Sequence, residues 1–331
     1  MARRLLTIAA VLAGLVLLEV LLPRLVTNQY YLRILMLCGI NVILAVSLNL
    51  VNGLTGQFSI GHAGFMAVGG YGSAILTMRV LPPLHAALAG AGLPQPLADG
   101  AVLLVALLVG GLLAALAGWA VGLPSLRLRG DYLAIVTLGF GEIIRVVITN
   151  IDAVGGARGL SGVPRYTTFF WVALGVVVVV VLSYNLLKSS HGRAMLAVRE
   201  DEVAAEALGV DTTRYKVIAF VLSAFFAGVA GGLFAHFDSY LNPSSFTFLR
   251  SIEIVTMVVL GGMGSVSGAI LAAIFLTGLP ELLRPVKEYR LVIYAFLLIV
   301  LMITRPQGLL GTRELKLPRM PWARPAAGKA R

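Results

Sequence analysis

The sequence predicts an all-α, polytopic membrane protein, and composition is the first observation that does so. Hydrophobic residues make up 59% of the 331 positions, whereas Asp, Glu, Lys and Arg together make up 12%. Soluble domains have about 45–50% apolar and about 25% charged residues. Because a single core cannot hide so large an apolar excess, lipid must surround most of the chain. The net charge of +11 is then explained by basic loops between apolar segments, not by a nucleic-acid-binding surface.

Apolar segments of membrane-crossing length are the second observation. A helix crosses the hydrocarbon layer with about 20 residues, in a range of about 17–25. Ten spans are predicted, at residues 5–22, 33–52, 58–78, 100–122, 131–150, 168–187, 216–236, 251–262, 265–283 and 290–304. The eighth is short, and it either crosses fully or dips in and returns. We therefore expect one membrane domain over 1–304, followed by a basic tail over 305–331.

The first segment has an alternative interpretation as a signal peptide, because Arg3 and Arg4 precede it. Its apolar run is long, and Pro23 and Arg24 follow where a small-residue cleavage site would lie. These features favour a retained helix. The positive-inside rule then places both termini and the loop 188–215 in the cytoplasm, and it places Arg250 outside.

A weak internal repeat is the third observation. Ser59-Ile60 is followed by Gly69-Gly70-Tyr71-Gly72-Ser73, and Ser251-Ile252 is followed at the same spacing by Gly261-Gly262-Met263-Gly264-Ser265. These stretches fall in spans three and eight, which cross in opposite directions. They predict an inverted repeat of five helices plus five, an arrangement typical of transporters. Chance similarity between glycine-rich membrane helices is the alternative.

Polar side chains at membrane depth are the candidates for a transport pathway. The stretch from Gly53 to Gly64 is too rich in glycine for a smooth helix. Such a break is tolerated where it is buried in protein or lines a cavity. The alternative is that the polar groups only hold helices together. The pathway candidates are Asn49, Asn52, Gln57, Ser59, His62, Gly261, Gly262 and Gly264.

Charged residues are scarce within the predicted spans. Glu142 and Arg145 are three residues apart, so they can pair on one helix face. We expect a structural pair in preference to a proton path that uses His62. Glu253 lies near the outer end of span eight, where water can hydrate it.

The loop 188–215 predicts one amphipathic helix over 193–208. Apolar residues such as Leu196 and Val203 fall on one face, charged residues fall on the other, and Gly209 ends the helix. Docking into a groove of a partner protein is one interpretation, and lying on the membrane surface is the other. The net acidic polar face disfavours anionic lipid and so favours the partner. No phosphate-binding loop, metal-binding motif or catalytic motif occurs in the sequence.

Several stretches resemble the branched-chain amino-acid ABC transporter permeases of the LivM type. The most specific reads Gly192-Arg-Ala-Met-Leu-Ala-Val-Arg-Glu-Asp-Glu-Val-Ala-Ala-Glu-Ala-Leu-Gly209. Others lie at 48–64, 130–142, 155–162 and 257–265. Residues 79–99 match no part of that pattern that we can place.

The resemblance implies a transport subunit of the bacterial inner membrane that has no enzymatic activity and no cofactor. It implies four kinds of partner: a second, related permease subunit in a heterodimer, two cytoplasmic ABC ATPases that hydrolyse ATP, a periplasmic substrate-binding protein, and the lipid bilayer. The implied cargo is a branched-chain or related neutral amino acid, with urea or a short amide as the alternative. The ATPase contact is expected at Gly192, Arg193, Ala197, Arg199, Glu200, Asp201, Glu202, Ala205, Glu206, Leu208 and Gly209.

Two other functional classes fit the residues less well. An ion-coupled secondary transporter would need paired intramembrane carboxylates or a clear cation site. A membrane-embedded enzyme would need a cluster of His, Asp or Glu at one depth. The sequence offers little of either.

Overall fold

The computed structural model describes residues 13–22, 28–92, 94–126, 130–284, 289–305, 307–311 and 314. Predictions for residues 1–12, and for most of the tail 305–331, lie outside these residues. The first predicted span is therefore described only in part, as a helix over Ala13–Leu22.

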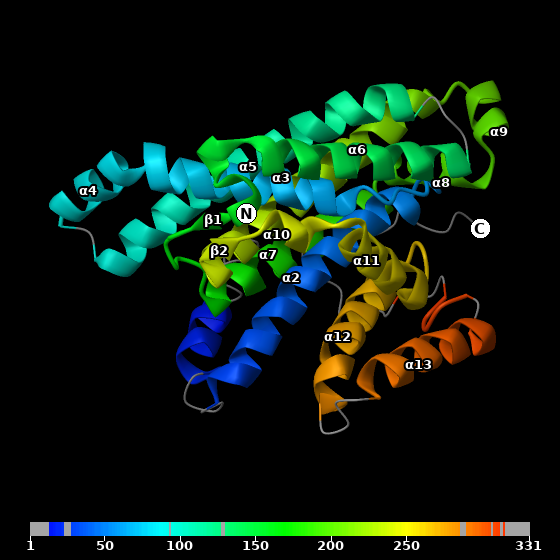
Figure 1. The fold of residues 1–331 in the computed structure, drawn as a ribbon. Coiled ribbons are helices and arrows are strands. Elements are labelled where there is room, and N and C mark those ends of the chain that lie inside the picture. The colour runs from blue at the N-terminus through cyan, green and yellow to red at the C-terminus, as the bar shows by residue number, and fades with distance from the viewer. Residues whose placement is uncertain are drawn as a thin grey trace.

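Long helices dominate the described residues, as the composition predicts (Figure 1). Their bounds are α2 (Gln29–Asn52), α3 (His62–Ile75), α5 (Gln95–Ser125), α6 (Asp131–Asn150), α7 (Phe169–Lys188), α10 (Thr212–Asp238), α11 (Phe248–Gly261), α12 (Val266–Leu282) and α13 (Arg290–Thr304). The shorter elements are α4 (Pro82–Gly90), α8 (Ser190–Glu200), α9 (Glu202–Ala207), a π-helical turn over Leu76–Val80, 3₁₀ turns at Asp152–Val154, Gly156–Arg158 and Pro243–Phe246, and the strands β1 (Leu160–Ser161) and β2 (Tyr240–Leu241).

Five of the described helices are long and apolar enough to cross a membrane. A sixth is obtained when His62–Val80 and Pro82–Gly90, which meet at 58°, count as one broken span. The chain is thus a multi-pass helical membrane protein. Helix α11 has 14 residues, which gives it a length of about 21 Å at 1.5 Å per residue. That length is less than the hydrocarbon thickness of about 30 Å, so α11 alone does not supply a complete crossing.

Helix α10 lies at the centre of the bundle, packed against α2, α3 and α5. Small residues allow this packing, since a Cβ atom placed on Gly69 of α3 would come within 3.0 Å of the Gly228 backbone on α10. Close backbone approach of this kind is the usual basis of helix association in lipid. Large buried side chains such as Leu44, Phe220 and Leu233 fill the remaining space.

Two breaks interrupt the helices. Residues 53–61 between α2 and α3 contain no helix, which confirms the predicted break and moves the start of the third segment from residue 58 to His62. A second break runs through residues 239–247 between α10 and α11, within the connection between the predicted spans 216–236 and 251–262, and contains β2 and a 3₁₀ turn. Each break is followed by a helix whose first turn bonds another helix, as the Ala63 amide bonds Ser251 and the Phe248 amide bonds Glu142.

The connections gather at two opposite ends of the helices, with α4 at one end and α8 and α9 at the other (Figure 1). At the α4 end, β1 pairs antiparallel with β2, Arg79 donates to the Ala153 carbonyl, and Arg33 forms an ion pair with Asp238 at 2.7 Å. At the α8 end, Arg199 donates to the Gly53 carbonyl at 2.8 Å.

Candidate functional site

Most of the predicted pathway side chains are buried and bonded within the protein. Asn49, Asn52, Ser59 and His62 have relative exposures of 1–3%. The Asn52 Oδ1 atom accepts a hydrogen bond from the Ser59 amide at 3.2 Å, and His62 Nε2 lies 2.9 Å from Ser47 Oγ. These contacts join the two sides of the first break. Gln57 is partly exposed.

The predicted glycines of the second half meet the first break at the α8 end. The Gly264 amide donates to Asn49 Oδ1 at 2.8 Å, so the structure brings together two candidates that are far apart in sequence. Gly262 and Gly264 have φ values of 105° and 94°, a conformation that favours glycine. Gly261 packs against Gly268 so closely that a Cβ atom on it would lie less than 3.0 Å from the Gly268 carbonyl.

The loop 188–215 contains two helices and not the single predicted one. Asp201, with φ −156° and ψ 111°, ends α8, and its Oδ1 atom accepts from the Ala204 amide at 3.0 Å to cap α9. An aspartate that binds the backbone two or three residues later favours a helix start over a helix interior. The predicted helix was therefore too long.

The end of α8 at Asp201 also divides the predicted apolar face of the loop. Met195, Val198 and Ala205 are buried, and Met195 packs with Leu50, Leu54 and Ala219 of the neighbouring segments. Val203 and Leu208, in contrast, are 64% and 84% exposed. The loop therefore presents an apolar surface to its surroundings, which a docking segment requires.

Helix α9 is fastened to the start of α10. Lys216, only 3% exposed, forms an ion pair with Glu202 at 2.5 Å, and the Thr212 hydroxyl donates to Glu206 at 2.7 Å. Gly192, in the first turn of α8, packs against the Leu186 carbonyl. The segment has exposed residues at Arg193, Glu200, Asp201 and Gly209, whereas Ala197 is partly buried.

Arg199, an expected ATPase contact, has its side chain directed into the protein. Its guanidinium donates to the Gly53 carbonyl at 2.8 Å, and a Cβ atom on Gly264 would lie 2.5 Å from the same Nη1 atom. One side chain of α8 thus contacts the first break and the turn between α11 and α12. Neither contact could be read from the sequence, since both depend on tertiary packing.

A second polar cluster lies on α6 and α11. Glu142 and Arg145 form the predicted pair, with Arg145 Nε 2.7 Å from Glu142 Oε2, and Glu142 Oε1 accepts from the Phe248 amide at 3.0 Å. Arg250 donates to Glu253 at 2.9 Å and to Asn41 at 2.6 Å. Asn41 is in the middle of α2, so Arg250 reaches the level of the middle of that helix, whereas Arg250 and Glu253 were expected from the sequence near the outer end of span eight.

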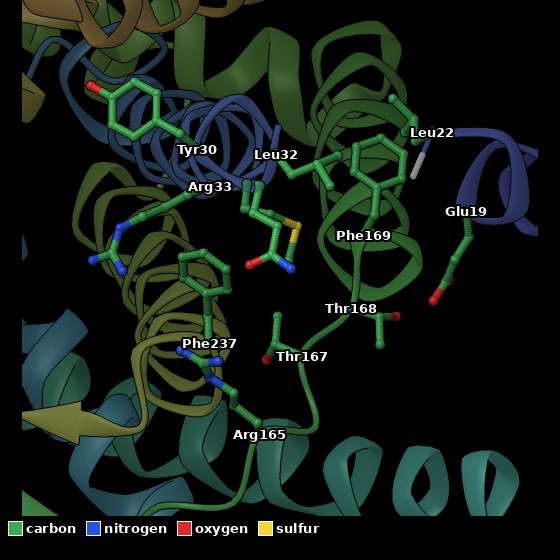
Figure 2. Close-up of a pocket in the computed structure, with 12 residues that line it drawn as sticks. Glu19, Leu22, Tyr30, Leu32, Arg33, Arg165, Thr167, Thr168, Phe169 and Phe237 are labelled. Carbon is green, nitrogen blue, oxygen red and sulfur yellow. The ribbon is translucent and has the colours of Figure 1, made fainter. Parts of the chain in front are cut away.

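Two cavities open at the α4 end, and no predicted pathway residue lines either one. The larger has a volume of about 650 Å³, and Figure 2 shows Glu19 on one side of it and Arg33 on the other. The smaller has a volume of about 300 Å³ and is lined by residues such as Thr77, His85 and Tyr166. Burial raises the pKa of the Tyr166 phenol, so this side chain stays neutral at physiological pH.

Many apolar helices, two internal breaks and a fastened helical loop define a multi-pass helical membrane protein. Residues 30–304 match the family described as branched-chain amino acid transport system, permease component. The chain belongs to this family.

Relatives within the family agree with this assignment. The chain is 41% identical over 315 residues to the high-affinity branched-chain amino acid transport permease LivM of Salmonella typhimurium, covering 84% of this chain and 70% of the relative. LivM of Escherichia coli is 40% identical, again over 84% of this chain and 70% of the relative. LivH of Escherichia coli, a permease protein of the same kind of system, is 31% identical over 59% of this chain. No solved structure matches the chain.

Proposed function

We propose that this permease subunit carries branched-chain or closely related neutral amino acids across the bacterial inner membrane, driven by ATP hydrolysis in separate subunits. The observation that carries the proposal is the contact of Arg199 with Gly53. It joins the exposed loop to the broken membrane helices within a chain that belongs to a permease family. The relatives named LivM support the branched-chain substrate.

The proposed topology has ten crossings in two inverted halves of five, with both termini in the cytoplasm. Its support is the similarity of the two breaks: α2, a break and α3 in one half, and α10, a break and α11 in the other. Helices α3 and α11 belong to predicted spans three and eight. Their first residues, His62 and Phe248, differ in register from the glycine motifs, which align Ser59 with Ser251. In this topology, residues 1–304 form one domain.

The contacts between loops also support this topology. Segments at the α4 end contact one another, as Arg79 contacts Ala153 and Arg33 contacts Asp238. Segments at the α8 end do the same, as Leu309 contacts Leu260 and Arg199 contacts Gly53. The ten-span alternation assigns each of these pairs to a single side of the membrane.

The proposed mechanism is alternating access with no covalent chemistry in this chain. A periplasmic binding protein delivers the amino acid at the α4 end, and a related permease subunit completes the pathway. Two ATPase subunits bind the exposed surface of α8 and α9. When they close on ATP, they displace α8, and Arg199 transmits that movement to the first break at Gly53 and to the turn between α11 and α12 at Gly264.

The ATPase contact is tested with Val203→Asp/Leu208→Asp, which places charge on the exposed apolar surface of the loop. We expect this variant to lose co-purification with the ATPase subunits. Leu97→Asp is the matched control, since Leu97 is 61% exposed at the opposite end. Undiminished ATPase binding by the loop variant would contradict the docking assignment.

The substrate is tested by uptake into proteoliposomes that contain the whole transporter. We expect ATP-dependent accumulation of leucine, isoleucine and valine. Accumulation of urea or a short amide with none of these amino acids would overturn the proposed substrate.

A further inference from the structure

Helix α11 begins level with the middle of α2 and α6, as two contacts of its first turn show. The Phe248 amide bonds Glu142 at 3.0 Å, and Arg250 bonds Asn41 at 2.6 Å. Glu142 lies in the middle of α6, whose 20 residues cover about 30 Å. Asn41 lies in the middle of α2. The start of α3 is at a similar depth, since the Ala63 amide donates to Ser251 Oγ at 3.1 Å.

Four charged side chains gather at this depth as two ion pairs. Arg145 pairs with Glu142 at 2.7 Å, and Arg250 pairs with Glu253 at 2.9 Å. The side chains of Glu142 and Arg145 are 32% and 30% exposed, and those of Arg250 and Glu253 are 21% and 53% exposed. The cluster therefore opens onto a surface of the chain and carries no net charge.

Lipid does not suit this surface. Ionisable residues at hydrocarbon depth almost always face the interior of a bundle or a water-filled cavity. Acyl chains against Glu142 and Glu253 would leave carboxylates without water, although each has one cationic partner. Transporter substrate sites lie near the bilayer midplane, where discontinuous helices begin, and α11 is such a helix.

We propose that this surface of α6 and α11 lines the translocation pathway, and that its two ion pairs bind the carboxylate and ammonium groups of a zwitterionic amino acid. The inference rests on the proposed transport of amino acids. The guanidinium of Arg250 or Arg145 takes the substrate carboxylate, for which its planar donors are suited. Glu142 or Glu253 takes the ammonium group.

The four side chains of the cluster have no net charge, and this explains why a zwitterion fits it. Bound substrate replaces each protein partner with a group of the same sign, so no charge is left unpaired at any stage. A ligand with one net charge would leave one side chain unpaired. These charged residues were not selected for the pathway from the sequence, because Arg250 was placed outside the membrane.

The first test removes both charges of a pair together. Glu142→Gln/Arg145→Gln keeps an acceptor for the Phe248 amide and keeps two polar side chains of similar size. In the complete transporter with its binding protein, we expect normal assembly and a fall in leucine uptake of about tenfold or more, as for an interaction needed during turnover. Arg33→Gln/Asp238→Asn removes the ion pair at the α4 end, and we expect it to keep uptake within about twofold of the unaltered protein, as surface pairs contribute little.

The outcomes separate the inference from the proposed function. If the unaltered transporter takes up no amino acid, the proposed function fails. If it takes up leucine and Glu142→Gln/Arg145→Gln does so within about twofold, the proposed function stands and the pathway assignment is overturned.

The second test measures access to water directly, in a Cys38→Ala background. Leu249 is 68% exposed beside the cluster, and Leu116 is 62% exposed on α5. We expect Leu249→Cys to react with a charged, membrane-impermeant thiol reagent and loaded binding protein to slow the reaction, whereas Leu116→Cys stays unreactive. A Leu249→Cys protein as inert as Leu116→Cys would overturn the inference.

Discussion

Replacement of Arg199 by alanine removes the one described contact between α8 and the Gly53 carbonyl. The bond is charge-assisted and 2.8 Å long, and Gly53 is buried. We expect the variant to assemble with its partners, since Arg199 is directed away from the exposed surface of the loop. We expect it to transport less substrate for each ATP hydrolysed.

The size of the effect follows from the hydrogen bond. A hydrogen bond to a charged group contributes about 1.5–3 kcal/mol, and it leaves a buried acceptor unpaired when it is removed. If the bond transmits the movement of α8, its removal takes this free energy from the coupling between closure of the ATPase subunits on ATP and movement of the first break. Each 1.4 kcal/mol is a factor of ten, so coupling falls by about tenfold to a hundredfold.

The assay is the ratio of leucine transported to ATP hydrolysed in proteoliposomes that contain all subunits. Arg214→Ala is the matched control, because it removes the same charge from an exposed side chain at the start of α10, outside the residues expected to contact the ATPase. We expect Arg214→Ala to leave the ratio unchanged. An unchanged ratio in Arg199→Ala, together with normal ATP hydrolysis, would refute the assignment of Arg199 as the link.

Two further substitutions test the packing that holds the loop and the breaks. Gly53→Ala places a Cβ atom less than 3.0 Å from Asn49 Oδ1 and the Gly264 amide, so we expect a loss of about 1–3 kcal/mol and a lower melting temperature in detergent. Gly139→Ala, where nothing lies within 4 Å of the added atom, should melt no lower than the unaltered protein, and equal melting of the two variants would contradict the packing argument. Glu202→Gln leaves Lys216 without its carboxylate, and loss of one partner from a buried pair costs about 3–5 kcal/mol; because Glu202 is 22% exposed, we expect the lower part of that range. We expect this loss to appear as faster proteolysis within the loop. The double variant Lys216→Met/Glu202→Leu should partly restore resistance to the protease. If Glu202→Gln is cleaved at the rate of the unaltered protein, the ion pair does not fasten α9.

The helices could be predicted from the sequence because a membrane helix must satisfy its own backbone groups. The predicted spans 131–150 and 290–304 have the same bounds as α6 and α13. The glycines between Gly53 and Gly64 also indicated a break correctly. The number of crossings and the inverted repeat stay predictions.

Features set by tertiary contacts were missed or misplaced. Residues 239–247 lie between two predicted spans, and Asn242 and Pro243 favour a turn there, but the sequence did not show that α11 begins level with the middle of α2 and α6. Helix α4 was not expected in the outer loop. Asp201 carries a helix-start signal within a run of strong helix formers, and that run was given too much weight.

The candidate site shows the same division. The sequence selected Asn49 and Gly264 as pathway residues, and the structure joins them by a hydrogen bond. Their role in transport stays a prediction, because the bonds they make also hold the helices together. The depth of Arg250 was not predictable, since it follows from where α11 begins relative to α2 and α6.

The central claim is that α8 and α9 face the cytoplasm and bind the separate ATPase subunits. The side of the membrane on which this loop lies tests that claim most directly. Leu208 is 84% exposed, and Arg158 at the α4 end is also exposed, so single cysteines at these positions in a Cys38→Ala background report both ends. We expect a membrane-impermeant thiol reagent to label Arg158→Cys in intact cells after outer-membrane permeabilisation and Leu208→Cys only in inverted vesicles. Labelling of Leu208→Cys in the intact cells would contradict the orientation and the coupling mechanism together.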